Sequence, residues 1–268
     1  MLYSPLAKSY KRAFPFRLAT TSYIYPDKII PNVTLLAPFF DEIELVLFES
    51  EANDNLTGEM EINTLIDLSI HQDVGFNIHL PIDIFLGDRS EEVRSKGALI
   101  VKKMIERTLP LGPSFYILHF DLRNRNEQEE SNVEAWHGHI IRSVKEIMEC
   151  GIEPNRICIE TLGYPFEWIE DIVRGFELSI CLDIGHVLMH GQDLQLYLKR
   201  YLPQASIIHL HGFQNGIDHL GIDRLYEPDL KLILSHLDDY KGIVSIEVFS
   251  INDLMRSLTI LEEKWGKD

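Results

Sequence analysis

Short apolar runs that each end on a potential metal-binding side chain are the feature that most constrains the fold of this chain. There are six of them: Phe76–His79, Tyr116–His119, Ile157–Glu160, Ser179–Asp183, Ile207–His209 and Val244–Glu247. Runs of this length, repeated about every 25 to 40 residues, are typical of strands in successive βα units. If these strands lie parallel in one closed sheet, their ends share one rim, which is where a (β/α)₈ barrel carries its active site.

The repetition matters more than any single residue. A strand-ending aspartate such as Asp183 is usually a cap or turn residue, and one buried histidine is usually a satisfied core residue. Six strand ends with metal-ligating side chains are harder to attribute to packing. Gly185 and His186 follow Asp183, and we expect Gly185 to bend the chain there so that Asp183 and His186 face one cation.

The length and composition favour one globular domain. The chain has 268 residues, of which 45% are hydrophobic and 25% are charged, so we expect a single barrel domain over 1–268 with an N-terminal arm at 1–16. That arm is either laid on the barrel or partly ordered. No apolar run is long enough to cross a bilayer, and no secretory signal is recognisable at the N-terminus. We therefore predict a cytoplasmic protein without a membrane partner.

The charge balance bears on partners. The formal net charge of −17 works against a nucleic-acid partner, because binding to a polyanion depends largely on lysine and arginine. A small ligand held by bound cations fits better. The sequence does not indicate an oligomeric state.

Alternating apolar and polar segments predict eight strand–helix units, which favours a closed barrel over an open sheet. The predicted strands are 17–22, 43–48, 76–80, 115–120, 156–160, 178–183, 206–211 and 242–249. Helices are predicted at 32–40, ending at or before Pro38, then at 59–72, 90–108, after Trp136, and at 166–174, 194–201, 229–237 and 253–265. Loops are predicted at 23–31, at 121–131, where we expect a mobile segment over the rim, and at 212–220.

The rim residues permit two kinds of chemistry. Glu160, Asp183, His209 and Glu247 suit a single Mn²⁺, Mg²⁺, Zn²⁺ or Fe²⁺ ion. One cation could bind the carbonyl and hydroxyl of a sugar while two carboxylates move a proton, which is isomerase or epimerase chemistry. We expect Glu160 and Glu247 to be the catalytic carboxylates.

A larger ligand set favours hydrolysis instead. Adding His79, His119 and His186 supplies ligands for a second and possibly a third cation. Two cations about 3.5 to 4 Å apart can hold the attacking and leaving oxygens of a phosphoester displacement. A non-catalytic, metal- or ligand-binding barrel is a third alternative. The number of ligands therefore separates the first two hypotheses.

Other chemistries are not indicated. No glycine-rich dinucleotide or phosphate-binding fingerprint follows a strand, and no G-x-S-x-G elbow is present. Tyr23 and Tyr25 lie in the first loop and either line the ligand pocket or pack within the loop. We include them, with His211, as candidate substrate-binding residues.

The motifs along nearly the whole chain resemble the xylose isomerase-like, or endonuclease IV-like, superfamily of metal-dependent TIM barrels. They are Asn77–Pro81, Leu118–His119, Ile159–Thr161, Leu182–His186, His209–His211 and Ile246–Glu247. The resemblance to endonuclease IV-like members implies a three-metal cluster on His79, His119, Glu160, Asp183, His186, His209, His219 and Glu247. The resemblance to the isomerases implies one metal on Glu160, Asp183, His209 and Glu247.

One position departs from the endonuclease pattern. An aspartate is expected two residues before His219, but Ile217 stands there and Asp218 is its neighbour. Either the alignment shifts by one residue or a ligand of the third metal is absent. Together with the acidic charge, this departure makes DNA repair the least favoured activity of the superfamily.

Within this superfamily, the N-terminal motifs are similar to those of the cobamide-remodelling phosphodiesterases. They are Thr20–Asp27 with Pro31–Val33, then Glu44–Glu49 and His79–Asp83. This resemblance implies hydrolysis of the phosphoester in the nucleotide loop of a cobamide, giving a cobinamide-type product. It also implies divalent metal ions (Zn, Mn or Fe), two or three per chain, and a small-molecule substrate, either a cobamide or, in the alternative, a sugar phosphate.

Overall fold

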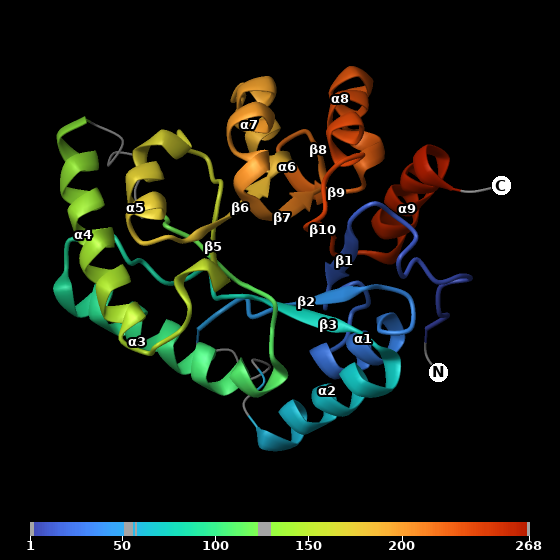
Figure 1. Cartoon of the computed structure of the whole chain (residues 1–268), viewed down its shortest axis with the longest axis horizontal. Coiled ribbons are helices and arrows are strands. Elements are labelled where there is room, and N and C mark those ends of the chain that lie inside the picture. Colours follow the sequence, from blue (N-terminus) through green and yellow to red (C-terminus); the bar gives the residue numbers. More distant parts are fainter. Residues whose placement is uncertain (1–2, 51–55, 57, 123–129, 267–268) are drawn as a thin grey trace.

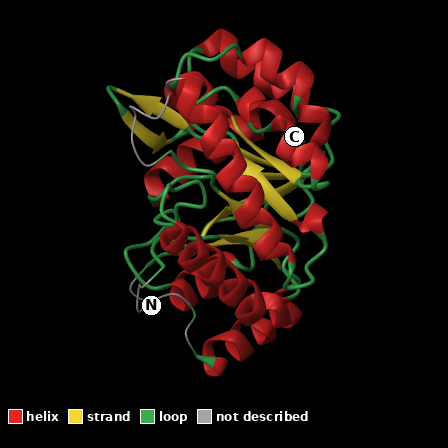
Figure 2. Ribbon diagram, turned by 90° about the vertical axis from the view of Figure 1, so that its left-hand side faces the viewer, coloured by secondary structure: helices red, strands yellow, loops and turns green. Residues whose placement is uncertain are grey.

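Parallel strands form a closed barrel at the centre of the molecule, and helices surround it (Figures 1 and 2). The computed structural model describes residues 3–50, 56, 58–122 and 130–266. Within these residues the order around the barrel is β1-β10-β7-β6-β5-β4-β3-β2. The strands are β1 (Arg17–Thr21), β2 (Glu42–Val46), β3 (Gly75–His79), β4 (Tyr116–Leu118), β5 (Ile157–Glu160), β6 (Ser179–Asp183), β7 (Ala205–Leu210) and β10 (Ile243–Ile246). The predicted (β/α)₈ barrel is confirmed.

The α-helices pack on the outside of the barrel and cover its strands (Figure 2). They are α1 (Ile29–Leu36), α2 (Glu59–Gln72), α3 (Glu91–Thr108), α4 (Glu130–Met148), α5 (Glu170–Gly175), α6 (Ile184–Met189), α7 (Leu194–Arg200), α8 (Glu227–Leu237) and α9 (Ile251–Trp265). Short 3₁₀ turns lie at Leu109–Leu111, Pro154–Arg156, Phe166–Trp168, Leu202–Gln204 and Ile222–Arg224. Among the helices that the structure describes, none is long and apolar enough to cross a membrane.

Both ends of the described chain lie on the same side of the barrel (Figure 1). Tyr10 is buried, and its hydroxyl donates to Glu262 Oε1 of α9. Phe14 and Phe16 pack edge-on against Trp265, with ring centroids 6.0 and 5.3 Å from it. The described part of the predicted N-terminal arm is therefore packed against the last helix, and these contacts join the two ends of the chain.

The barrel interior changes character from one end to the other. Small and branched apolar side chains fill its middle: Ala19, Ile117, Cys158, Cys181, Ile207 and Ile243. Below them, at the amino ends of the strands, Glu42 is 2% exposed. It receives hydrogen bonds from Arg17 Nη1, Asn77 Nδ2 and Ser114 Oγ. This end is closed by polar contacts within the protein.

Several predicted boundaries need correction. Residues 212–220, predicted as a loop, form an antiparallel hairpin of β8 (Gly212–Gln214) and β9 (Ile217–Leu220). Its turn is Asn215–Gly216, with φ of 55° and 77°, and Asn-Gly is the preferred pair of such a two-residue turn. That dipeptide was a local signal for a hairpin.

Helix α1 begins at Ile29, three residues before the predicted start, because Pro31 is tolerated in the first helical turn. The segment predicted as one helix at 166–174 is a 3₁₀ turn followed by α5. Most of the predicted mobile segment at 121–131 lies outside the described residues.

The segment after Asp183 is also different from the prediction. Gly185 does not bend the chain but is the second residue of helix α6. A Cβ atom at this position would collide with the imidazole ring of His211. Glycine is therefore required here because a ring from a neighbouring element packs against the helix backbone.

Candidate active site

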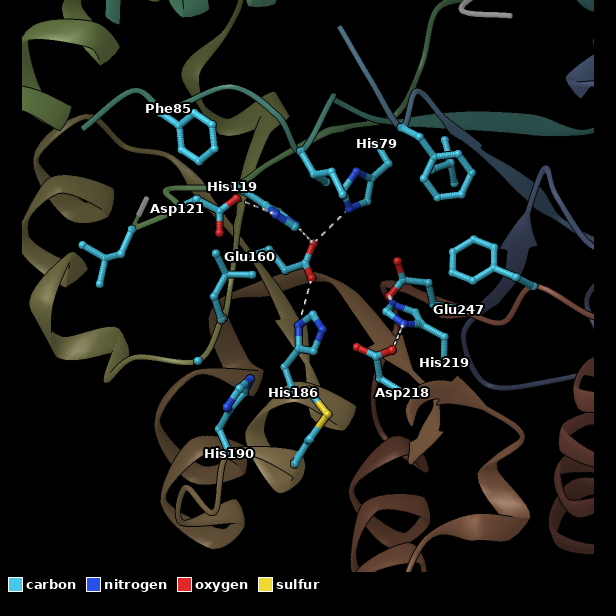
Figure 3. A pocket seen from close by; sticks show the side chains of 18 residues that line it. His79, Phe85, His119, Asp121, Glu160, His186, His190, Asp218, His219 and Glu247 are labelled. Atoms are coloured by element: carbon cyan, nitrogen blue, oxygen red, sulfur yellow. Dashed lines mark hydrogen bonds and ion pairs between the residues drawn. The ribbon is translucent and has the colours of Figure 1, made fainter. Parts of the chain in front are cut away.

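The carboxyl ends of the barrel strands surround a pocket of about 560 Å³ (Figure 3). His79, Glu160 and Asp183 are the last residues of β3, β5 and β6. His119 and Glu247 follow β4 and β10 directly. Because parallel strands end at the same edge, residues far apart in the sequence converge here.

Glu160 lies at the centre of this group and is 1% exposed. Its Oε2 atom is 3.2 Å from His79 Nε2 and 2.9 Å from His119 Nε2. Its Oε1 atom is 3.3 Å from His186 Nδ1. Figure 3 shows the three imidazoles pointing at this one carboxylate. One buried negative charge is therefore shared by three histidines from three elements.

His209 faces the remaining carboxylates. Its Nδ1 atom is 3.0 Å from Glu247 Oε2, 3.6 Å from Glu160 Oε2 and 3.9 Å from Asp183 Oδ2. One ligand atom from each of these four residues lies within 4.8 Å of the others. The four residues predicted to bind a single cation are thus brought together.

Asp183 and Glu247 each connect this group to further histidines. Asp183 Oδ1 accepts from the His186 backbone N–H at 2.7 Å and so caps helix α6. Its Oδ2 lies 3.1 Å from His186 Nδ1. Glu247 Oε2 lies 3.5 Å from His219 Nε2 on β9. All eight predicted metal ligands therefore lie in one continuous cluster.

The pKa values show how the cluster is balanced without a cation. Burial by itself lowers the pKa of a histidine, but the carboxylate charges outweigh it. They raise the pKa of His119 and His209 well above the usual value, that of His186 to about 9 and that of His219 to about 10.

The carboxyl groups respond in the opposite direction. Burial by itself raises the pKa of Glu160 and Glu247, but the neighbouring histidine charges hold both well below the usual value. In the metal-free protein, the protons on the histidines therefore compensate the carboxylate charges, as bound cations would.

Unsatisfied polar atoms test whether the site fits a metal. Within the described residues, His186 Nδ1, His209 Nδ1 and Glu247 Oε2 are buried and have no hydrogen-bond partner. Each of these atoms lies 3.0 to 3.3 Å from an atom of opposite charge, but the geometry of these contacts is not that of a hydrogen bond. Atoms that converge on a shared point without bonding one another are what a cation site requires. The donor set fits divalent ions.

The far nitrogen of several histidines is also held, which fixes the orientation of the ring. Glu44 Oε2 lies 3.0 Å from His209 Nε2, and Asp121 Oδ2 lies 3.3 Å from His119 Nδ1. Asp218 Oδ1 lies 3.1 Å from His219 Nδ1. Such outer partners are typical of metal-binding histidines.

The sequence alone assigned no role to Glu44 or Asp121, and it offered Asp218 only as a match shifted by one residue. Asp121 and Asp218 stand close to a candidate ligand in the chain, and that proximity was a usable signal. Glu44 lies on β2, distant from β7 in the sequence, and only the closed barrel brings it to His209. Asp218 contacts the His219 ring, and it belongs to none of the candidate ligand groups among the described residues.

The predicted substrate-binding residues separate into different environments. Tyr23 is half-buried and packs against Phe48, whose side chain lines the pocket, with 4.9 Å between ring centroids. Tyr25 is buried, its hydroxyl donates to Ser4 O at 2.9 Å, and it is not among the described pocket-lining residues. His211 is buried behind Asp183, 3.2 Å from its Oδ1 atom. The structure thus places His211 in contact with the cluster and Tyr23 behind one wall of the pocket, whereas Tyr25 is packed elsewhere.

The outer part of the pocket is largely apolar. Its apolar lining consists of Val46, Phe48, Ile82, Phe85, Leu122, Leu162, Met189 and Phe249. The charged cluster thus forms the floor, and aromatic and aliphatic side chains form the walls. A ligand that fits this pocket combines an anionic or polar group with substantial apolar surface.

Comparison with known proteins agrees with this architecture. Residues 40–266 match the family described as xylose isomerase-like TIM barrel. The uncharacterised protein MJ1311 of Methanocaldococcus jannaschii is 25% identical over an alignment 286 positions long, gaps included, which covers 96% of this chain and 92% of that protein.

Solved structures show the same fold. A D-tagatose 3-epimerase-like protein has a TM-score of 0.74 and 22% identity, covering 93% of this chain and 97% of its own. Endonuclease IV from Thermus thermophilus has a TM-score of 0.71 and 15% identity, covering 92% and 98%. The IOLI protein with a bound zinc atom has a TM-score of 0.70 and 14% identity, covering 94% and 98%. The family match over most of its length shows that this chain belongs to the xylose isomerase-like TIM barrels.

Proposed function

We propose that this protein is a metal-dependent phosphodiesterase that cleaves the phosphoester in the nucleotide loop of a cobamide. The observation that carries the proposal is the size of the ligand cluster. Glu160, Asp183 and Glu247 each lie between histidines that belong to different groups of possible ligands. Such a set exceeds what one cation needs and suits the two or three cations of a phosphoester hydrolase.

Different residues of the cluster would hold the two cations and accept the proton. His79, His119 and Glu160 would hold one cation, and Glu160, Asp183, His209 and Glu247 a second. The bound cations would stabilise the negative charge on the phosphoester oxygens. In hydrolysis the oxygen of water bonds to phosphorus, the bond from phosphorus to the leaving oxygen breaks, and that oxygen takes up a proton. Glu247 Oε2 is buried and has no hydrogen-bond partner within the described residues, so this carboxylate is available to accept the proton of the attacking water.

The pocket walls support a substrate larger than a simple sugar. Phe48, Phe85 and Phe249 stand around the charged floor. Aromatic rings of this kind pack well against a flat heterocycle, such as the lower-ligand base of a cobamide. The similarity of the N-terminal motifs to cobamide-remodelling phosphodiesterases supports the same choice. The net charge of −17 is unfavourable for DNA, and the absence of nucleic-acid binding stays a prediction.

A direct assay tests this proposal. The metal-loaded protein is incubated with a complete cobamide, and the corrinoid products are separated by chromatography. We expect loss of the lower-ligand nucleoside, which a chelator and the Glu247→Ala variant should each prevent. An intact cobamide in the presence of fully loaded protein would reject this substrate.

A second candidate is a single-metal sugar epimerase or isomerase. It is favoured by the complete group of Glu160, Asp183, His209 and Glu247 and by the fold shared with a D-tagatose 3-epimerase-like protein. Under this alternative, His79→Ala and His119→Ala should remain partly active, whereas both should be inactive as phosphodiesterases. Deuterium exchange from D₂O into a ketose such as D-tagatose or D-fructose would reveal epimerase chemistry.

A further inference from the structure

The missing aspartate at position 217 raises the question of what completes the outer end of the cluster. The side chain of Ile217 is aliphatic and has no atom that could bind a cation, and it is 60% exposed. His186, His211 and His219, however, each offer a nitrogen atom, and all three atoms lie within 4.8 Å of one another. Zinc–nitrogen bonds of about 2.0 to 2.1 Å place the donors of one ion about 3.3 Å apart. Small rotations of the three rings would satisfy that requirement.

We propose that His211 replaces the absent aspartate and that His186, His211 and His219 form an all-imidazole zinc site beside the carboxylate-rich cluster. This inference rests on the proposed function only in that it assigns a further cation to the same active site. It changes His211 from a candidate substrate contact to a metal ligand.

The local structure is built around the ring of His211, which is fully buried. Its ring stacks on His219, with 4.4 Å between centroids and 14° between planes. The ring of His186 meets both edge-on, at 5.4 Å from His211 and 5.8 Å from His219. Gly185 leaves the space that the His211 ring occupies. Three elements, α6, the end of β7 and the hairpin strand β9, thus position the three rings.

Both ring nitrogens of His211 have partners in the protein, and these partners allow two tautomers. Its Nδ1 atom lies 3.1 Å from Gly212 O, to which it can donate. The His219 backbone N–H also lies 3.1 Å from Nδ1 and competes for this position. Nε2 lies 3.3 Å from Asp183 Oδ2 and 3.2 Å from Asp183 Oδ1. With the proton on Nδ1, a cation bound to Nε2 would take the place of the proton that Nε2 otherwise shares with this carboxylate. The carbonyl of Gly212 then plays the orienting part that carboxylates play for the other histidines.

The backbone of His219 has an uncommon conformation that fits this arrangement. Its φ of 54° is in the left-handed region, which is uncommon for residues other than glycine, although histidine adopts it more often than most. The hairpin turn at Asn215–Gly216 holds β9 in place, and Asp218 holds the far side of the His219 ring. The β8–β9 hairpin, which was not predicted from the sequence, therefore positions His219 as the third ligand.

The chemistry of the donors predicts selectivity. Three neutral imidazoles suit zinc, whereas a set of three carboxylates and one imidazole also accepts the harder Mn²⁺ or Mg²⁺. The three-histidine site should therefore fill with zinc and remain weakly occupied when only Mn²⁺ is offered. The centre would then hold ions of two kinds when both are present.

Zinc stoichiometry tests the proposal without any substrate. Native mass spectrometry of the zinc-loaded protein should show one ion fewer per chain in His211→Gln than in the unsubstituted protein. The matched control is His190→Gln, because His190 lines the same pocket but belongs to none of the ligand groups among the described residues. It should keep the full count.

A crystal measured at the zinc edge locates the ion. An anomalous peak between His186, His211 and His219 is expected, and it should vanish in His211→Gln while the other peaks remain. If His211→Gln does not fold, the peak in the unsubstituted protein decides, since His211 Nε2 must lie within bonding distance of the ion. An unchanged zinc count in a folded His211→Gln variant, or a peak that excludes His211, would overturn the assignment. Because no cobamide is present, failure of the proposed function would leave these results unaffected.

Discussion

Buried carboxylates at the two ends of the barrel have different partners. At the amino ends of the strands, Glu42 is bound by an arginine, an asparagine and a serine. At the carboxyl ends, the ion-pair partners of Glu160 and Glu247 among the described residues are histidines. Burial raises the pKa of Glu42 despite Arg17, whereas the histidines lower the pKa values of Glu160 and Glu247.

This difference separates a structural acid from a functional one. Arginine is always protonated and cannot bind a metal, so the contacts of Glu42 are permanent. Histidine can release its proton and bind a cation through the same atom. Burial alone therefore does not identify a metal site, whereas burial together with exchangeable partners does. The following predictions test this distinction.

The largest effect is expected from Glu160→Gln. The substitution keeps the shape but removes the charge that three histidines share, so cation binding and charge stabilisation are lost together. We expect hydrolysis to fall by about 10³-fold or more, with the fold largely retained by circular dichroism. Glu42→Gln is the matched control, since it makes the same chemical change at the other end of the barrel. Comparable losses of activity in both variants would contradict the distinction.

A smaller effect is expected from Glu44→Gln. Glu44 contacts His209 from inside the barrel and fixes its ring, but it is not itself in the candidate ligand groups of the described residues. Loss of such a partner typically weakens metal binding by about 10- to 100-fold. Competition with a chromophoric chelator measures the affinity. An unchanged affinity would show that the barrel alone orients His209.

The pH dependence of metal binding follows from the raised histidine pKa values. Below pH 9 to 10, His186 and His219 are protonated in the metal-free protein. Cations must displace these protons, so affinity should fall as the pH is lowered from 9 toward 7. Calorimetry in buffers of different ionisation enthalpy should reveal proton release. Binding without proton release at pH 7 would contradict the charge balance described above.

Stability of the metal-free protein should change in the same range. A histidine whose pKa is raised on folding contributes stability that is complete below its usual pKa of 6.5. That contribution is lost as the pH rises through its folded pKa of about 9 to 10. The metal-free protein should therefore become less stable to urea between pH 7 and pH 10. The metal-loaded protein should lose less, because the bound cations keep the carboxylates compensated.

The smallest effect is expected from Glu42→Gln itself. Its raised pKa indicates that the charged form is already disfavoured by burial, and the Arg17 side chain is half exposed and can be hydrated. We expect a loss of about 1 kcal/mol or less in the free energy of unfolding, measured by urea denaturation, and unchanged metal content. A loss of bound metal in this variant would connect the two ends of the barrel.

The sequence predicted the barrel and the cluster because both depend on where strands end. The end of each apolar run marks the end of a strand, so the local sequence shows that His79, Glu160 and Asp183 stand at strand ends. Closure of the sheet then brings these residues together. The partnership of Glu44 with His209 depends on which side chains point inward across the barrel, which no local pattern contains. The place of His211 depends on packing against Gly185, a contact between two elements. Tyr25 is held by the N-terminal segment rather than by the pocket.

The most direct test of the account is a titration of the metal-free protein with zinc, in which cobamide hydrolysis is followed against the number of ions bound per chain. We predict that activity remains low until each chain holds more than one ion and then rises to its full value. Full activity with a single ion per chain would contradict the multi-cation centre and favour the single-metal alternative.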